Sequence, residues 1–215
     1  MSLILAIDLS TKPGVAIFEN DKLVKVWTEF NDKTVEDFGK YPDNYIKFTK
    51  YTIEKLIKAV QDTGYNWNKF DTIVLEETTA SKQNYSQKKL EFLHYQLLLS
   101  LSNMINKIVY IRDGTWKRIN EVERSKEEKA INTKIKNLKR KTGKRVIRRD
   151  EEGNALRKVN KYDVYIRRCN DLFGTNFDRK EEDSAAACLL GRAFLKGAPS
   201  CDGRVKGGIL LKVRT

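Results

Sequence analysis

The sequence predicts an α/β fold built on a five-stranded mixed sheet flanked by helices. Two observations lead to this prediction. Three short β segments follow one another near the N-terminus with only turn signals between them, which favours antiparallel pairing. Two further apolar strands then alternate with amphipathic helices, an order typical of parallel strands.

The antiparallel part covers residues 3–9, 15–19 and 23–30. The first segment is apolar almost throughout, as expected for a strand buried on both faces. Ser10-Thr11-Lys12-Pro13-Gly14 is typical of a tight turn, and Asn20-Asp21 is a hairpin signal. We therefore expect the chain to begin with three antiparallel strands.

The remaining elements follow from apolar spacing. Pro42 introduces a helix whose apolar residues recur as far as Val60, and Gly64 is its expected stop. Residues 71–76 and 108–111 are predicted strands, and residues 87–106 between them are a predicted helix. Two helices close the fold: residues 162–173, ended by Gly174, and the alanine-rich residues 183–195.

The positive charge of the chain is concentrated in one segment. The net charge is +13, the sequence pI is about 9.5, and residues 112–168 hold 20 Lys and Arg against 9 Asp and Glu. Such an excess favours a polyanionic partner, either nucleic acid or an anionic membrane. We interpret residues 1–215 as one domain with a basic insertion at 117–160, before the last two helices; Glu152-Gly153-Asn154 in it resembles a hairpin turn.

Composition excludes several classes of protein. A hydrophobic content of 40% with only three prolines is that of a globular chain. No apolar stretch is long enough to cross a bilayer, and no signal peptide is recognisable, so we expect a cytoplasmic protein without a membrane partner. Three cysteines without a CxxC spacing suit reduced thiols. The single histidine, His94, excludes a multi-histidine site and favours a packing role.

Three acids occupy matching positions. Asp8 ends the first strand, Glu76 ends the fourth, and Asp183 begins the last helix. One such acid alone is more often a cap or turn residue. Three carboxylates brought together repel one another unless a divalent cation neutralises them, and oxygen ligands suit Mg²⁺ or Mn²⁺. Two such ions about 4 Å apart are able to support phosphodiester hydrolysis.

These residues belong to short motifs that resemble the RuvC-like Holliday junction resolvases of the RNase H-like superfamily, and most of all their phage-encoded branch. The motifs are Ile7-Asp8-Leu9-Ser10, Gly14-Val15-Ala16-Ile17, Ile73-Val74-Leu75-Glu76, Phe173-Gly174 and Lys180-Glu181-Glu182-Asp183-Ser184-Ala185-Ala186-Ala187. The resemblance implies an RNase H-like sheet, a homodimer, and Mg²⁺-dependent paired nicking of four-way DNA junctions in recombination or repair. It also implies that Asp8, Glu76 and Asp183 bind metal, and that a phage protein acts in the cytoplasm of its bacterial host.

The chain departs from the family pattern at two positions. The family commonly has an acid or a histidine three residues before the last aspartate, where this chain has Lys180. We expect Glu182 to be the fourth acid, as in the paired acids of mitochondrial resolvases, with Glu181 and Asp178 as alternatives. Bacterial members carry an aromatic residue three positions after the strand glutamate. Here that residue is Thr79, which cannot stack on a base. Tyr85 is the alternative stacking residue, unless its ring serves in packing.

Basic residues are expected to bind the phosphate backbone with a steep dependence on salt. The expected DNA-binding residues are Lys82, Tyr85, Lys117, Arg118, Lys139, Arg140, Lys141, Lys144, Arg145, Arg148 and Arg149. The alternatives to a junction resolvase are another RNase H-like nuclease that cuts RNA–DNA hybrids, and a basic DNA-binding module without turnover. The first motif also resembles the phosphate loop of actin-like ATPases, but the chain is too short for their two halves.

Overall fold

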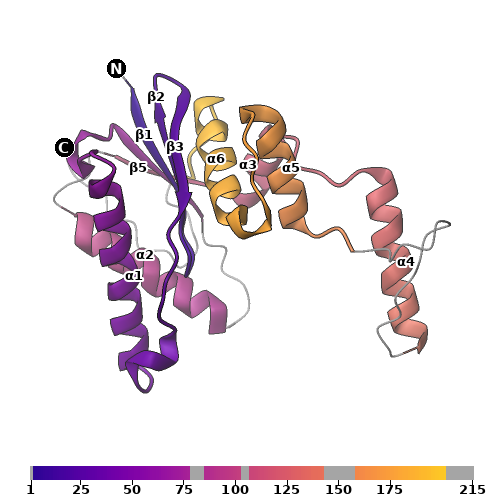
Figure 1. The fold of residues 1–215 in the computed structure, drawn as a ribbon, viewed down its shortest axis with the longest axis horizontal. Coiled ribbons are helices and arrows are strands. Elements are labelled where there is room, and N and C mark those ends of the chain that lie inside the picture. The colour runs from indigo at the N-terminus through magenta and orange to yellow at the C-terminus, as the bar shows by residue number, and fades with distance from the viewer. Residues whose placement is uncertain (1, 78–84, 103–106, 143–157, 202–215) are drawn as a thin grey trace.

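The structure, a computed structural model, describes residues 2–77, 85–102, 107–142 and 158–201, with backbone alone at 85–86 and 138–142. The sheet has the order β3-β2-β1-β4-β5 (Figure 1). Strands β1 (Leu3–Asp8), β2 (Gly14–Glu19) and β3 (Lys22–Thr28) are antiparallel. Strands β4 (Thr72–Glu76) and β5 (Ile108–Ile111) run parallel to β1, which confirms the predicted mixed sheet.

The hairpin between β2 and β3 turns at the residues that the sequence indicates. Asn20 and Asp21 have φ values of 46° and 68°. Two successive residues with positive φ match the right-handed twist of the flanking strands, and Asn and Asp tolerate this conformation better than most residues. The local sequence thus determines the antiparallel start of the fold.

Helices cover both faces of the sheet (Figure 1). On one face, α1 (Asp43–Asp62) and α2 (Tyr85–Leu101) pack over apolar strand residues such as Leu5 and Ile7. On the other face lie α3 (Asp113–Ile119), α5 (Lys161–Phe173) and α6 (Glu182–Leu195). None of the described helices has both the length and the apolar composition that crossing a bilayer requires.

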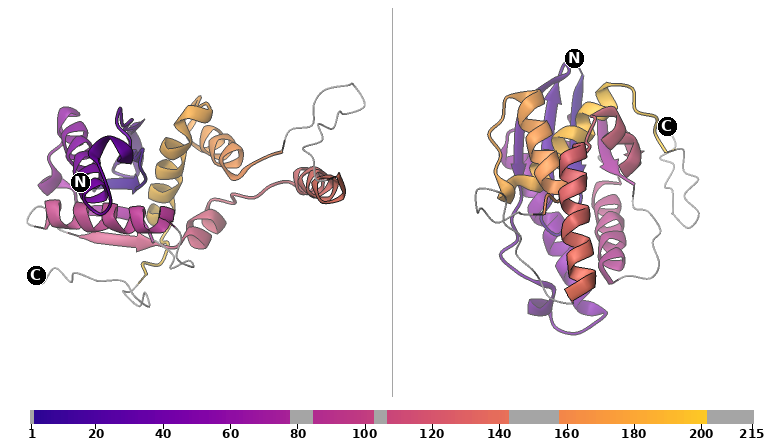
Figure 2. Two further views of the ribbon diagram at one scale, coloured as in Figure 1. Left: turned by 90° about the horizontal axis from the view of Figure 1, so that it is seen from below. Right: turned by 90° about the vertical axis from the view of Figure 1, so that its right-hand side faces the viewer.

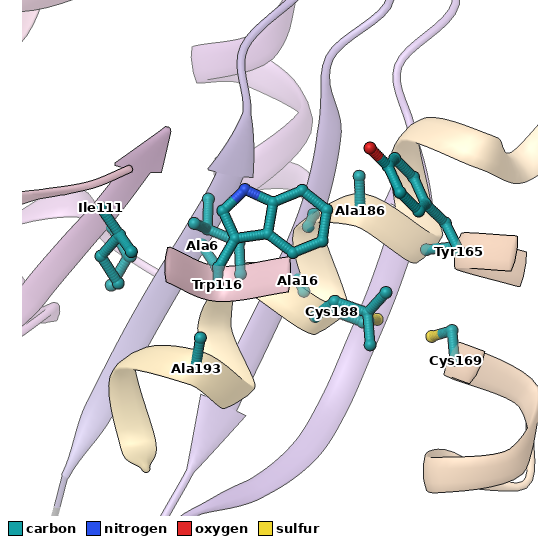
Figure 3. Packing of buried hydrophobic residues seen from close by; sticks show 14 of the residues in the cluster. Ala6, Ala16, Ile111, Trp116, Tyr165, Cys169, Ala186, Cys188 and Ala193 are labelled. Atoms are coloured by element: carbon teal, nitrogen blue, oxygen red, sulfur yellow. The ribbon is translucent and has the colours of Figure 1, made fainter. Parts of the chain in front are cut away.

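The alanine-rich helix α6 lies close to the sheet because its buried side is built from small residues. Figure 3 shows Ala186 and Ala193 of α6 facing Ala6 and Ala16 of the sheet. Gly191 lies on the same buried side of α6, where a Cβ would lie 2.3 Å from the ring of Phe18. Small side chains therefore bring the backbone of α6 onto the strands.

Most helix ends agree with the sequence. The α1 helix ends beside Gly64, which has φ 90°, and α5 ends at Gly174 in the left-handed conformation. The second helix begins at Tyr85, two residues earlier than expected, and its described part ends at Leu101. The basic insertion contains a helix that we did not predict, α4 (Lys126–Thr142), and the preceding α3 was also missed. The turn expected at residues 152–154 lies outside the described residues.

Candidate active site

Asp8 and Glu76 end two neighbouring strands. Ile7 pairs with Leu75 in the parallel register of β1 and β4, so the next residue of each strand is an acid. Adjacent strands lie about 4.8 Å apart. Ile7 and Leu75 point into the core beneath α1 and α2. Because side chains alternate along a strand, Asp8 and Glu76 point to the other face, toward α6.

A backbone contact brings Asp183 to the same place. Gly14 is the partner of Asp8 across β1 and β2. A Cβ on Gly14 would lie 1.9 Å from the carbonyl oxygen of Asp183, so the first turn of α6 touches the strand where only glycine fits. The hydroxyl groups of Thr28 and Ser184, 2.6 Å apart, are hydrogen-bonded across the same junction. We call Asp8, Glu76 and Asp183 the acid cluster.

The three acids interact electrostatically. Burial raises the pKa of Asp8 well above its usual value, and the neighbouring charges of Glu76 and Asp183 raise that pKa further. Burial, followed by the charge of Glu182, raises the pKa of Asp183 to about 6. Burial and then the charge of Asp113 raise the pKa of Glu76. Three neighbouring carboxyl groups whose pKa values are all raised by burial and by nearby negative charge have the character of a cation site.

An indole orients Glu76. The Nε1 of Trp116 donates a hydrogen bond of 2.8 Å to Oε2 of Glu76, which lowers the pKa of that carboxyl against the effect of burial. Trp116 itself is 1% exposed and packs edge-on against Tyr165, as Figure 3 shows. A rigid, buried donor therefore holds one carboxylate oxygen of Glu76 in a fixed direction.

The structure also bears on the fourth acid. Glu182 adjoins Asp183, and its own pKa is raised by burial. The alternatives serve as helix caps: Oδ1 of Asp178 accepts a hydrogen bond of 2.7 Å from the amide of Lys180, and Oε2 of Glu181 accepts one of 3.1 Å from the amide of Asp178.

Sequence reasoning missed a second neighbouring acid, Asp113, which begins α3 directly after β5. Its charge raises the pKa values of both Asp8 and Glu76. Part of its signal was available, because Asp113 comes two residues after the predicted strand 108–111, whereas Asp8 and Glu76 are the last residues of theirs. Asp113 also forms an ion pair with Lys117, four residues later in α3.

Positive charges lie beside the acids. Lys161, the first residue of α5, lowers the pKa values of Asp8, Glu76, Glu182 and Asp183 through its charge. Lys12 acts in the same direction on Glu182 and Asp183. These two lysines stand where a phosphate group bound at the acids would also need positive charge.

The donor chemistry fits a hard divalent cation. Buried carboxylates from β1, β4 and α6 supply oxygen ligands and excess negative charge, as Mg²⁺ and Mn²⁺ require. Within the part of the chain that the structure describes, no three acidic, histidine or cysteine side chains form a closed set of metal ligands. The fit therefore rests on the chemistry and charge of the donors.

The other predicted site residues fall into three groups. Lys117 is half-buried against Asp113, and Arg118 is exposed. Tyr85 begins α2, and Lys139, Arg140 and Lys141 lie on α4, with only their backbone described. Lys82, Lys144, Arg145, Arg148 and Arg149 lie outside the described residues.

His94 packs against Tyr110, with their ring centroids 5.8 Å apart. Burial lowers the pKa of His94 to about 4, which agrees with a packing role.

Comparison with known proteins shows which solved structures share this fold. No family model matches the chain, and no curated protein matches its sequence. Among solved structures, Thermus thermophilus RuvC in complex with a Holliday junction substrate aligns over 92% of this chain and 98% of its own, with a TM-score of 0.52 and 8% identity. Thermus thermophilus RuvC in a second structure gives a TM-score of 0.49 at 8% identity over the same shares of the two chains. The yeast mitochondrial Holliday junction resolvase Ydc2 gives 0.46 at 12% identity, over 91% and 78% of the two chains. The chain thus has a RuvC-like fold, and the predicted RNase H-like architecture is confirmed.

Proposed function

We propose that this protein is a metal-dependent endonuclease that resolves four-way or branched DNA junctions by hydrolysing phosphodiester bonds. One observation carries the proposal: the acid cluster gathers at the carboxyl ends of β1 and β4 on a RuvC-like fold. Buried acids whose pKa values are raised by burial and by neighbouring carboxylates are costly unless they serve a charged ligand. A cation and a phosphate backbone together are such a ligand.

Each residue of the site has a role in this proposal. Asp8, Glu76 and Asp183, with Glu182 as the fourth acid, would hold two Mg²⁺ ions, for which Mn²⁺ substitutes. When bound, the ions activate a water molecule and stabilise the leaving oxygen. Trp116 keeps Glu76 in its orientation. Lys161 places a positive charge beside the acids, where it stabilises the charge that develops on the cleaved phosphate.

The basic segment supplies the contacts to DNA in this proposal. Arg118 is exposed and lies five residues after Asp113, the acid that begins α3. The remaining proposed phosphate contacts are Lys82, Lys117, Lys139, Arg140, Lys141, Lys144, Arg145, Arg148 and Arg149, with Tyr85 proposed to stack on a base. Lys117 is already paired with Asp113, so its contact requires exchange of partners.

Paired nicking requires two active sites, and hence two copies of the chain. Leu93 and Leu97 of α2 are buried on its own sheet, whereas Tyr95 and Leu99 are 57% and 49% exposed. Tyr95 and Leu99 are four residues apart and share a helix face. We propose that this face contributes to a homodimer, and that the protein acts in the cytoplasm, in a bacterial host if it is of phage origin.

A cleavage assay tests the proposal. Labelled four-way junction, linear duplex and RNA–DNA hybrid are each incubated with the protein in Mg²⁺ or in EDTA. We expect opposed nicks in the junction only, in Mg²⁺ only, and none from the Glu76→Gln variant. Glu54→Gln, an exposed glutamate on α1, is the matched control and keeps activity. Cleavage of the hybrid alone identifies the other nuclease class, and binding without cleavage identifies a non-catalytic module.

A further inference from the structure

The helix α4 stands apart from the rest of the molecule. Figures 1 and 2 show it beyond two connecting segments, residues 120–125 and 158–160, extending away from the sheet and α6. It spans 17 residues, or about 25 Å at 1.5 Å per residue. Its start is capped: the Ser125 hydroxyl accepts from the Glu128 amide at 3.2 Å, and Glu128 Oε2 accepts from the Ser125 amide at 2.8 Å. We call α4 the basic arm.

Specific contacts fix the base of the basic arm. Arg167 of α5 donates two hydrogen bonds to Glu128, of 2.6 and 3.2 Å. Asn132 exchanges two hydrogen bonds with the backbone of Val159, of 2.8 and 3.0 Å. Both contacts come from one side of the helix, because residues 128 and 132 are one turn apart. The rotation of the basic arm about its own axis is therefore determined.

Three exposed lysines lie along one flank of the helix, next to this anchored side. Lys126, Lys129 and Lys136 are spaced so that they lie on one helix face, and all three are exposed. We call these three residues the lysine stripe. Ile131 and Ile135 are partly buried and lie on the side of Glu128 and Asn132. Lys136 follows Asn132 by one turn, so the lysine stripe adjoins the anchored side, and all three of its side chains are exposed to solvent.

Both connections of the basic arm lead back to the acid cluster. Asp113 begins the helix before the arm, and Lys161 begins the helix after it. The charges of both residues act on Asp8 and Glu76. The helices on either side of the arm in the chain thus each begin beside the acids. A duplex whose phosphate lies at the acids has the arm within reach.

We propose that the lysine stripe binds the phosphate backbone of a DNA duplex that flanks the nicking site. This inference rests on the proposed function for the position of the DNA. The stripe spans about 15 Å, which matches about four successive phosphates of one strand. Its lysines are exposed, and the pair that Lys129 forms with Glu123, at 3.1 Å, is itself on the surface and readily exchanged. The arm thereby supplies affinity for duplex outside the active site.

The test compares two triple variants of the 215-residue chain. Lys126→Gln, Lys129→Gln and Lys136→Gln are combined in one variant; Lys47→Gln, Lys50→Gln and Lys58→Gln on α1 are combined in the other. Both remove three exposed lysines from one helix face, and each set includes one lysine in a surface ion pair. Equilibrium binding to a four-way junction is measured in EDTA over a range of salt, with long arms and with arms cut to a few base pairs.

For the stripe variant we expect a log–log salt dependence less steep by about 2.7, because each phosphate contact contributes about 0.9. Wild type then loses about 40-fold more affinity than this variant between 50 and 200 mM salt. We also expect the variant to lose the preference for long arms, while the α1 variant behaves as wild type. An unchanged slope in the stripe variant, as for a stripe that binds an acidic protein, overturns the inference. So does an equal loss in both variants.

Binding in EDTA separates this inference from the proposed function. If the protein binds junctions through the lysine stripe but never cuts them in Mg²⁺, the nuclease proposal is wrong and the inference about the stripe is supported. If the protein cuts junctions and the stripe variant binds and cuts as wild type does, the nuclease proposal is supported and the inference about the stripe is wrong.

Discussion

The carbonyl oxygen of Asp183 lies against Gly14, the residue that pairs with Asp8 across the first two strands. This contact joins the last helix to the second strand, next to the end of the first strand, although 175 positions separate the two aspartates in the sequence. The spacing between Asp8 and Asp183 thus depends on a position that has no side chain.

Gly14→Ala should therefore displace the start of α6. The new Cβ would lie 1.9 Å from a backbone oxygen that has no flexible end to move. We expect a loss of about 1–3 kcal/mol in unfolding free energy and loss of junction nicking. Urea denaturation and the cleavage assay measure both effects. Gly114→Ala, where a Cβ meets nothing within 4 Å, is the control, and an equal effect in both variants would contradict the prediction.

Trp116→Phe should raise the Mg²⁺ concentration that nicking requires. The change keeps an aromatic ring in the core but removes the hydrogen bond to Glu76. Hydrogen bonds to charged groups contribute about 1.5–3 kcal/mol, so we expect about a tenfold or larger shift in the half-saturating Mg²⁺ concentration. Trp67→Phe removes an indole bond to the Ile57 carbonyl on the other face of the sheet, and should leave the Mg²⁺ requirement unchanged.

Lys161→Gln should slow cleavage more than it weakens binding. Its charge acts on all four acids, so its loss raises their pKa values and removes positive charge beside the phosphate. We expect a fall of about 10- to 100-fold in the single-turnover rate, with affinity for the junction nearly unchanged. The exposed Lys158 lies three residues away, and Lys158→Gln is the control. A loss of affinity with a normal rate would show that Lys161 only binds DNA.

Asp113→Asn and Glu182→Gln should distinguish the two neighbours of the acid cluster. The residue that contributes to metal binding should, when changed, reduce nicking in Mg²⁺ and shift the Mg²⁺ titration. We expect this of Glu182, with a smaller effect of Asp113 because Lys117 already neutralises it. The reverse order of effects in the same titration would assign the fourth ligand to Asp113.

Without metal, the folded protein should lose stability as pH rises from about 4 to 6. The pKa of Asp183 rises from 3.8 to about 6 on folding, so the folded state binds more protons in this interval and stability declines as they leave. The full shift corresponds to about 3 kcal/mol, and solvent screening reduces it to about 1–2 kcal/mol. Urea unfolding in EDTA should show Asp183→Asn more stable than wild type at pH 8, with little difference at pH 4. Equal unfolding free energies of the two proteins at pH 8 would show that ionisation of Asp183 does not destabilise the folded state.

The sheet and the acid cluster were predictable because their signals are local. Buried strands are continuous apolar runs, and Asp8 and Glu76 stand out as the charged residues that end them. Their convergence follows once β1 and β4 are adjacent and parallel, which the order of strands and helices implies.

The missed elements have weaker signals. In α4 the large apolar residues Ile131, Ile135 and Leu138 mark one side of a sequence that is otherwise rich in lysine and polar residues. Asp113 belongs to a short helix rather than to a strand, so its position beside the acids depends on how α3 packs. The contact of Gly14 with Asp183 depends on three-dimensional packing and has no mark in the sequence beyond the glycine itself.

The close approach of Gly191 to Phe18 has a consequence at the opposite end of the same helix. A methyl carbon added to Gly191 would lie only 2.3 Å from the Phe18 ring, so we expect any bulkier residue there to push α6 away from the strands. The first turn of α6, which contains Asp183, would then be displaced as well. We therefore expect glycine at position 191 in related sequences, because a larger residue there would move the Asp183 carboxylate, which lies more than two helical turns away.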